Sequence, residues 1–424
     1  MQTLVIKRYT LLSALLFVEI TSASAQVAEI IQVSSVVNER ETLLNPGKFS
    51  TIPSPTHETA LILSDQLSVG DLTSFSYRMR LEYDSGEPEQ RFDATLQEAS
   101  FSTFIQQRWV VNAGKTQLGW DMATSFQPLG FFQDSENLFD LTDVQSRSSG
   151  LPLIAATYLR PSWSATVVYS DDKWSAYDGF NSGVEQWGGR FQYQSASSDW
   201  SLVLQKPAGQ NMGAGFSATF SPTDYMVTYV SAFYRQGTRR PQNLMLDSRQ
   251  PQLAAFYPFS HHRKQSDTPY WRGVLGSTFA FRHLDLTLEL THDERGLDTL
   301  MWRRLSDLIA FHNQLLISET TPEVRELIAR NLFFDSQTLS THGARETYVF
   351  AYLKTETDYA DASLYTRTAL EDKSALVGIT LQKTLSTALT ISLSAQTFLG
   401  GQHDEFGITP VDSSFQFTLR YLFN

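Results

Sequence analysis

Two short runs in this sequence combine histidine with carboxylates, the residue types that acid–base catalysis and metal binding require. They are His292-Asp293-Glu294 and His403-Asp404-Glu405, and both stand where loops are expected to begin. Neither has the His-Glu-x-x-His spacing of a metal-binding helix. The chain also lacks a Gly-x-Ser-x-Gly nucleophile motif and contains no cysteine. We therefore expect loop residues here, with no enzymatic activity, no metal and no cofactor.

Charged side chains also recur at alternate positions of otherwise apolar segments, where they would lie on the polar face of a strand. The charged residues that we place on such faces, and predict to line a pore, are Arg78, Arg80, Glu82, Arg190, Arg272, Arg282, Asp285, Glu289, Asp361, Arg367 and Arg420. Seven arginines against four acids would favour anions in a confined aqueous path. Alternatively, the charges pair across neighbouring strands, as Arg282 and Asp285 would, and only stiffen the wall.

The last ten residues indicate which element carries these side chains. Bulky apolar residues occupy every second position of residues 415–423, and Gln416, Thr418 and Arg420 stand between them. One face of this strand suits lipid and the other suits water. The pattern resembles the closing strand and assembly signal of bacterial outer-membrane β-barrels. That resemblance implies contact with outer-membrane lipid and lipopolysaccharide, and insertion by the barrel-assembly machinery through the C-terminal strand.

The N-terminus indicates an exported protein. Lys7 and Arg8 precede an apolar run at residues 11–18, and Ala23-Ser24-Ala25 supplies a small-residue cleavage site, so residues 1–25 predict a signal peptide. The apolar run is shorter than the roughly 20 residues that span a membrane as a helix. We expect residues 26–70, which contain three prolines, to form a periplasmic N-terminal lead-in. Residues 71–424 would then form the barrel, in the bacterial outer membrane.

About sixteen segments after residue 70 have strand length and alternate apolar with polar residues. Counted from residues 74–83, the even-numbered segments end in tight turns such as Arg160-Pro161-Ser162, whereas the odd-numbered ones mostly end in longer loops. This asymmetry is typical of outer-membrane barrels, with short periplasmic turns and long extracellular loops. The sequence therefore predicts an all-β fold, a transmembrane antiparallel β-barrel of about 16 strands, with a range of 14 to 18. A soluble β-sandwich also alternates, but its strands would be shorter.

The first long loop, near residues 119–150, is too apolar to extend freely into water. It contains the candidate constriction residues Trp120, Phe126, Pro128, Phe131 and Phe132, followed by the acids Asp134, Glu136, Asp140 and Asp143. We expect this loop to fold onto the barrel mouth or inward as a constriction.

Two further long loops have different characters. Residues 236–270 are basic and would either gather anions or form a solvated charge run. Residues 293–343 depart from period two, because Leu305, Leu308 and His312 recur at helical spacing. Thr321 followed by Pro322 is a typical helix start. We expect two short helices in this extracellular loop, either as a partial plug or as a lid without a role in permeation.

Composition agrees with a barrel. Charged residues make up 18% of the chain, against about 25% in typical soluble domains, and aromatic residues make up 12%. Serine, threonine and glutamine occupy polar positions instead, as expected for a strand face along a water-filled lumen. The net charge of −12 makes nucleic-acid binding unfavourable.

The block from Leu96 to Leu129 supports a further resemblance. Its segments Leu96-Gln97-Glu98-Ala99-Ser100-Phe101, Trp109-Val110-Val111-Asn112-Ala113-Gly114-Lys115, Gly119-Trp120 and Phe126-Gln127-Pro128-Leu129 resemble two strands and a following loop of porin-like families, the alginate-export family in particular. The resemblance implies a barrel with an inserted constriction loop. In that family an anionic polysaccharide passes through a lumen rich in arginine.

Three functional hypotheses follow. The first is an outer-membrane channel, or porin, for passive passage of small solutes with a preference for anions, as a monomer or homotrimer. The second is an export pore for an anionic exopolysaccharide such as alginate, which would need periplasmic partners. The third is a plugged barrel that acts as a surface-binding protein. Small or oligosaccharide solutes are the ligands that we expect in general.

Overall fold

The computed structural model describes residues 26–45, 54–84, 91–132, 149–171, 185–238, 242–243, 261–262, 266–318, 321–340, 343–357 and 359–423. The predicted signal peptide lies outside the described residues. So do the acids of the first long loop and most of the basic loop. Of the basic loop, residues 236–238 and 266–270 are described as strand ends, and residues 242–243 and 261–262 as a short strand pair.

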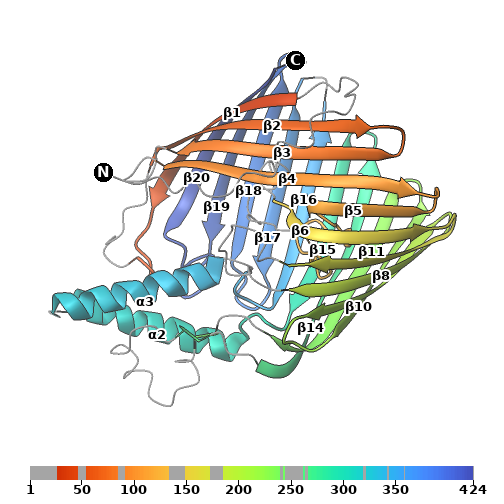
Figure 1. The fold of residues 1–424 in the computed structure, drawn as a ribbon. Helices are drawn as coiled ribbons and strands as arrows, with labels where there is room; N and C mark the ends of the chain where they lie inside the picture. Colours follow the sequence, from red (N-terminus) through yellow and green to blue (C-terminus); the bar gives the residue numbers. More distant parts are fainter. Residues whose placement is uncertain are drawn as a thin grey trace, which may run out of the picture.

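Eighteen strands form one closed antiparallel sheet (Figure 1). The strands are β1 (Gln26–Glu39), β2 (Thr56–Val69), β3 (Thr73–Asp84), β4 (Arg91–Ile105), β5 (Trp109–Thr116), β6 (Leu151–Leu159), β7 (Trp163–Ser170), β8 (Gln186–Gln194), β9 (Ser198–Pro207), β10 (Gly213–Thr223), β11 (Met226–Thr238), β14 (Ser266–Phe281), β15 (Leu284–Asp293), β16 (Thr347–Glu356), β17 (Asp361–Ala369), β18 (Ala375–Thr384), β19 (Leu389–Leu399) and β20 (Val411–Phe423). Each strand pairs with its neighbours along the chain, and β1 pairs with β20 to close the ring. The short pair β12 (Gln242–Asn243) and β13 (His261–His262) stands apart. The predicted barrel is confirmed, at the upper end of the expected range of strands.

Side chains alternate between the two faces of the wall, as period two requires. On β15, Leu288 and Leu290 are 42% and 45% exposed, whereas Glu289 between them is 2% exposed. On β9, Leu202 and Leu204 are likewise exposed and Val203 is buried. The exposed set faces outward as an apolar belt, and the alternate set faces the lumen. This outward placement of the bulky residues agrees with the sequence-based assignment.

The expectation that residues 26–70 form a separate lead-in is wrong for two segments, because β1 and β2 are strands of the barrel wall. Sixteen strands follow residue 70, and these two complete the eighteen. The alternation of apolar and polar residues did not identify these two strands, and the reason is physical. Ala28, Ile30, Ala60 and Ile62 form a buried apolar cluster on the inner face, so both faces of these strands carry apolar residues.

The connections divide the barrel into two ends, which we call the turn end and the loop end. Short turns at residues 70–72, 106–108, 160–162, 195–197, 224–225, 282–283, 357–360 and 385–388 lie at the turn end, together with Gln26 and Phe423. The loop end carries the other connections, including the long ones. Short turns therefore alternate with the remaining connections, as the sequence predicts.

Two helices lie at the loop end, α2 (Thr299–Ile317) and α3 (Pro322–Ser340), and we call them the helical hairpin (Figure 1). Asp298 caps α2 by accepting a hydrogen bond from the Met301 backbone N–H at 2.7 Å. The start of α3 at Pro322 confirms the Thr-Pro signal. Neither described helix combines the length and apolar character that crossing a membrane requires.

Candidate functional site

The connection after β5 turns into the barrel and lies against its inner wall; we call residues 117–132 the lumen loop. Trp120, Leu129 and Phe132 are at most 4% exposed. They pack with inward-facing residues of five strands, namely Leu153, Ala155, Val168, Val203, Phe233 and Tyr270. Burial of this many apolar side chains supplies the main driving force for docking.

Two carboxylates fix the polar part of the lumen loop. Glu289 accepts hydrogen bonds from the backbone N–H groups of Thr124 and Ser125 at 2.7 and 2.8 Å, from the Ser125 hydroxyl, and from the Tyr229 hydroxyl at 2.5 Å. Asp121, within the loop, accepts from the Ser231 hydroxyl at 2.9 Å and from the Leu129 N–H at 3.0 Å. Since charge-assisted bonds are the stronger class, these groups hold the loop in one position along the wall.

Glycines on the wall create the space that the lumen loop occupies. A Cβ at Gly215 would lie 2.5 Å from Leu129 Cδ2, and one at Gly188 would lie 2.6 Å from Phe132 Cε2. Both separations are shorter than van der Waals contact, so only glycine permits this approach. The Gly213-Ala214-Gly215 run was visible in the sequence, but no local pattern tells which segment packs against it.

The predicted constriction residues lie in the lumen loop, and most of their side chains point at the wall. Trp120, Pro128 and Phe132 are buried, while Phe126 and Phe131 are partly buried. Met122, which the sequence reasoning missed, is 65% exposed on the same loop. The loop therefore takes up lumen space through its backbone and Met122, with its aromatic residues as anchors.

The wall from β17 through β20 carries mostly polar side chains on its inner face. Ser392, Ser394, Gln416 and Thr418 face inward and remain partly exposed. Exposure of inward-facing polar groups is expected when eighteen strands enclose more space than their side chains fill. The loop thus covers one side of the lumen, and a polar wall faces it.

The predicted pore-lining charges occupy several environments. Arg80 is 4% exposed and forms ion pairs with Glu58 and Glu82, so it matches the alternative in which charges stiffen the wall. Glu289 is buried beneath the lumen loop. Arg367 is 7% exposed and lies over the Tyr348 ring at 4.1 Å. These groups do not present free charge to the lumen.

The remaining charges of that set are more accessible. Arg78, Arg190, Asp285 and Asp361 lie on inner strand faces and are partly exposed, and Arg420 is exposed near the turn end. Arg190 Nε donates to the Ser201 hydroxyl at 3.1 Å. Arg282 was placed on the wall incorrectly, because it lies exposed in the turn between β14 and β15. The turn interrupts the alternation that had suggested an inward position.

Three arginines gather beside the lumen loop, and two of them were not singled out from the sequence. Arg272 lies over the rings of Phe131 and Phe233 at 4.9 and 5.3 Å, and its Nε has no hydrogen-bond partner among the described residues. Arg235 and Arg295 both lie 5.4 Å from the Tyr270 ring centroid. Asp293 pairs with Arg295. Three guanidinium groups and this carboxylate thus form a charged cluster beside the lumen loop.

The two histidine–carboxylate runs have structural contacts. His292 stacks on Trp271 with ring centroids 4.4 Å apart, and its Nδ1 lies 3.0 Å from the Thr347 hydroxyl. His403 contacts α2, where its carbonyl accepts from Trp302 Nε1 at 2.7 Å and its Nδ1 lies 2.6 Å from the Ser306 hydroxyl. Within the described part of the chain, His, Asp and Glu side chains form no group of three that could hold a metal ion.

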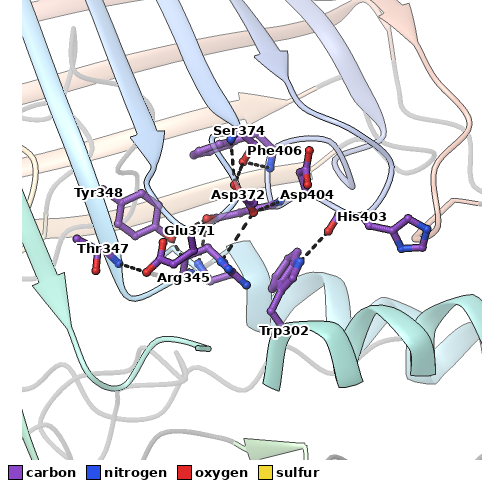
Figure 2. A network of polar contacts seen from close by, with 12 residues as sticks. Trp302, Arg345, Thr347, Tyr348, Glu371, Asp372, Ser374, His403, Asp404 and Phe406 are labelled. Atoms are coloured by element: carbon purple, nitrogen blue, oxygen red, sulfur yellow. Dashed lines mark hydrogen bonds and ion pairs between the residues drawn. The ribbon is translucent and has the colours of Figure 1, made fainter. Parts of the chain in front are cut away.

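A polar network lies between the helical hairpin and the strand ends, and we call it the latch (Figure 2). It contains Trp302 of α2, Arg345, Tyr348, Asp372 and Glu405, and Arg345 reaches the hairpin by lying over the Trp302 ring. Glu405 accepts from the Tyr348 hydroxyl and the Ala344 N–H, each at 2.8 Å. Asp372 accepts from the Glu405 N–H at 3.0 Å and lies 3.8 Å from Arg345 Nε. Burial raises the pKa of the Glu405 carboxyl above its ordinary value.

The outer surface carries aromatic side chains near both ends. Near the turn end, Trp109, Tyr158, Trp163 and Phe191 form a chain of ring contacts with centroids 4.9 to 5.8 Å apart. Towards the loop end, Tyr169 and Trp187 pair at 4.6 Å. Aromatic belts that flank an apolar band are the usual exterior of a membrane barrel.

Comparison with known proteins agrees with this architecture. No protein-family model matches the sequence, and no curated protein sequence matches it. The crystal structure of OccAB1 from Acinetobacter baumannii is similar over 94% of this chain and 96% of that chain, with a TM-score of 0.54 and 8% identity. A triple mutant of the porin of Rhodopseudomonas blastica is similar over 95% and 100%, with a TM-score of 0.40 and 11% identity. At 8% identity, the likeness to OccAB1 concerns the fold alone.

Proposed function

We propose that this protein is a porin of the bacterial outer membrane, a channel through which small solutes pass passively. The observation that carries the proposal is the closed wall of eighteen strands, with an exposed apolar belt outside and a partly exposed polar face inside. A closed barrel satisfies all strand hydrogen bonds in lipid. A ring of this size leaves an aqueous path when its interior residues are small and polar.

The lumen loop sets the width of this path in our proposal. It lies on one side of the lumen, held by Glu289 and by the apolar cluster around Phe132. Solutes would therefore pass between Met122 of the loop and the polar wall formed by β17 to β20. A narrowing of this kind suits small solutes and disfavours a polysaccharide chain.

A preference for anions rests on Arg272 and Arg420. Arg272 lies beside the lumen loop, where its Nε has no hydrogen-bond partner among the described residues, and Arg420 is exposed nearer the turn end. Because the wall is a low-dielectric boundary, such charges act over longer distances inside the lumen than in bulk water. Pairing of Arg80 with two acids reduces the excess that the sequence suggests.

Orientation and partners follow from the same features. We propose that the turn end faces the periplasm and the loop end faces outward, as in barrels with short periplasmic turns. The aromatic belts would meet lipid and lipopolysaccharide. The barrel-assembly machinery would recognise strand β20. The protein would assemble as a monomer or a homotrimer, both of which are compatible with this exterior.

Planar-bilayer recording tests the proposal. We expect the refolded protein to form open channels whose reversal potential in a salt gradient favours anions. Arg420→Ser should lower the anion-to-cation permeability ratio by about twofold or more, since charges near the path set selectivity. Arg282→Ser is the matched control, because it removes an arginine that lies in a turn, and it should leave the ratio unchanged. Absence of conductance in a correctly folded protein would contradict the channel and favour a plugged, surface-binding barrel.

A further inference from the structure

His312 stands out in the helical hairpin because it is buried without a polar partner. The residue is 2% exposed, and neither Nδ1 nor Nε2 has a hydrogen-bond partner among the described residues. It lies on the same stripe of α2 as Leu308, Ile309 and Leu316, at the three- and four-residue spacing of one helix face. A neutral imidazole is tolerated in such a place, whereas an imidazolium is strongly disfavoured.

The face of α2 that carries His312 also carries the apolar core of the hairpin. The hairpin core joins the stripe on α2 to Ile328 and Leu332 of α3, and it also contains Leu44 and Ile408 from two loop-end connections. This core attaches the hairpin to the barrel. Loss of its packing would therefore separate the helices from the loop end.

The charged groups of these elements are engaged elsewhere or point to solvent. Those on α2 and on the described part of α3 that carry exposed side chains are Arg303, Arg304, Asp307, Glu323, Arg325, Glu326 and Arg330. On the loop-end connections, Arg40 pairs with Asp412, Glu41 is exposed, Asp404 accepts from the Gly401 N–H, and Glu405 belongs to the latch. Arg345, beside Ala344 of the hairpin core, lies over the Trp302 ring at 5.1 Å and pairs with Asp372. His403 contacts Ser306. Burial alone thus lowers the pKa of His312, to about 4.

The hairpin contains two further buried acceptors without partners. Asn331 of α3 is 4% exposed, and within the described part of the chain neither its Oδ1 nor the Oδ1 of Asn313 on α2 has a hydrogen-bond partner. Buried polar atoms that lack hydrogen bonds reduce stability. Both amides therefore lower the free energy that holds the closed hairpin together.

We propose that the helical hairpin is an acid-released cap, in which protonation of His312 detaches the two helices from the loop end and widens the entrance to the lumen. The widening rests on the proposed channel function, whereas the detachment does not. Figure 1 shows both helices at that end of the barrel. The hairpin thus has a position from which its movement changes access to the lumen.

The sign of the effect follows from linkage. The closed cap holds His312 neutral, and the open cap exposes it to water, where its pKa is near the ordinary value of 6.5. The closed state is fully favoured above pH 6.5 and loses stability as the pH falls to about 4. The ratio of open to closed caps rises by up to about tenfold for each pH unit in this window. Glu405 acts in the opposite direction, because a raised carboxyl pKa favours the closed state in acid.

A thiol reporter measures detachment directly, because the chain contains no cysteine. Ile309→Cys places a single thiol at a side chain that is fully buried in the closed hairpin. Its reaction with 4,4′-dithiodipyridine, a reagent that works in acid, is compared at pH 7.5 and pH 4.5 in the full-length protein. Thr387→Cys, exposed at the turn end, corrects for the pH dependence of the reagent. We expect the corrected rate for Ile309→Cys to rise at least tenfold in acid.

Variants that combine the Ile309→Cys reporter with a histidine substitution test whether the response belongs to His312. His312→Leu and His312→Gln, which cannot titrate, should abolish the rise, and His283→Asn, which removes an exposed histidine at the turn end, should preserve it. Two variants of different polarity are used so that a folding defect in one does not end the test. Equal corrected rates at both pH values, or a rise that survives in both His312 variants, would overturn the proposal.

Conductance measured on the same proteins separates the two parts of the proposal. A larger single-channel conductance at pH 4.5 than at pH 7.5, absent in His312→Leu, would support widening of the entrance. Detachment without any change in conductance would refute the widening. Detachment in a protein that never conducts would refute the channel function and leave the acid-released hairpin standing.

Discussion

At the scale of single residues, the environment of a charge decides its role. Glu289, Arg80 and Arg420 all belong to inner strand faces by period, and the structure gives them three different roles. Glu289 holds the lumen loop, Arg80 forms ion pairs with two glutamates, and Arg420 remains exposed. Alternation determines the face on which a side chain lies. It does not determine which partner reaches that side chain, because partners come from distant segments.

Replacement of Glu289 by Gln should loosen the lumen loop. The amide nitrogen cannot accept a hydrogen bond, so the Ser125 N–H and hydroxyl lose the acceptor that Glu289 Oε2 provides. Loss of charge-assisted bonds at a buried site costs on the order of 3 kcal/mol of docking free energy. We expect a higher and noisier single-channel conductance, with an unchanged thermal transition of the barrel on a heat-modifiability gel. Asp285→Asn, which neutralises a partly exposed inner acid of the same strand, is the matched control and should leave the conductance noise unchanged. Conductance equal to wild type in Glu289→Gln would contradict the anchoring role.

At the scale of elements, the lumen loop and the helical hairpin differ in how far the sequence determines them. Helical spacing and the Thr-Pro start are local signals, so both helices were predictable. Docking of the lumen loop depends on wall glycines at Gly188 and Gly215, which lie far along the chain from the loop. Complementarity of this kind leaves no periodic signature in either segment.

Replacement of Gly188 by Val should displace the lumen loop from the wall. A valine side chain would occupy the space taken by the Phe132 ring, and overpacking of this kind typically costs about 1–3 kcal/mol. The barrel should still form, because β8 keeps its backbone pairing and valine favours strands. Proteolysis of the folded protein, followed by mass spectrometry, should show faster cleavage within residues 117–132. Gly189→Val, on the outward face of the same strand, is the matched control, and equal cleavage in the two variants would argue against docking through Gly188.

At the scale of the whole molecule, ring closure couples the two ends of the chain. β1 pairs with β20 on one side and with β2 on the other, so residues near the N-terminus complete the wall beside the C-terminal strand. Without them the sheet would have two open edges in lipid, each with unpaired backbone groups. The fold is therefore a property of the full ring.

A deletion of residues 26–69 that keeps the signal peptide tests whether this segment forms wall strands or a periplasmic lead-in. If β1 and β2 are wall strands, we expect loss of the heat-modifiable band and degradation of the protein in cells, because sixteen strands cannot close with the geometry of eighteen. A deletion confined to residues 46–53, between the two strands, should be tolerated. A stable barrel after the long deletion would restore the interpretation of the segment as a lead-in.

The sequence by itself determined the strand periods, the alternation of short turns with longer connections, the two helices and the lipid-facing character of β20. These features are local, since each depends on residues within one strand, turn or helix. Tertiary structure alone decided that β1 and β2 join the wall, that the aromatic residues of the lumen loop act as anchors, and that Arg80 is neutralised while Arg272 is not. These outcomes depend on which strands pair and on the curvature that brings inner-face residues of different strands into contact. A two-residue period carries no information about that curvature, and so the chemistry of the lumen is established only when the ring closes.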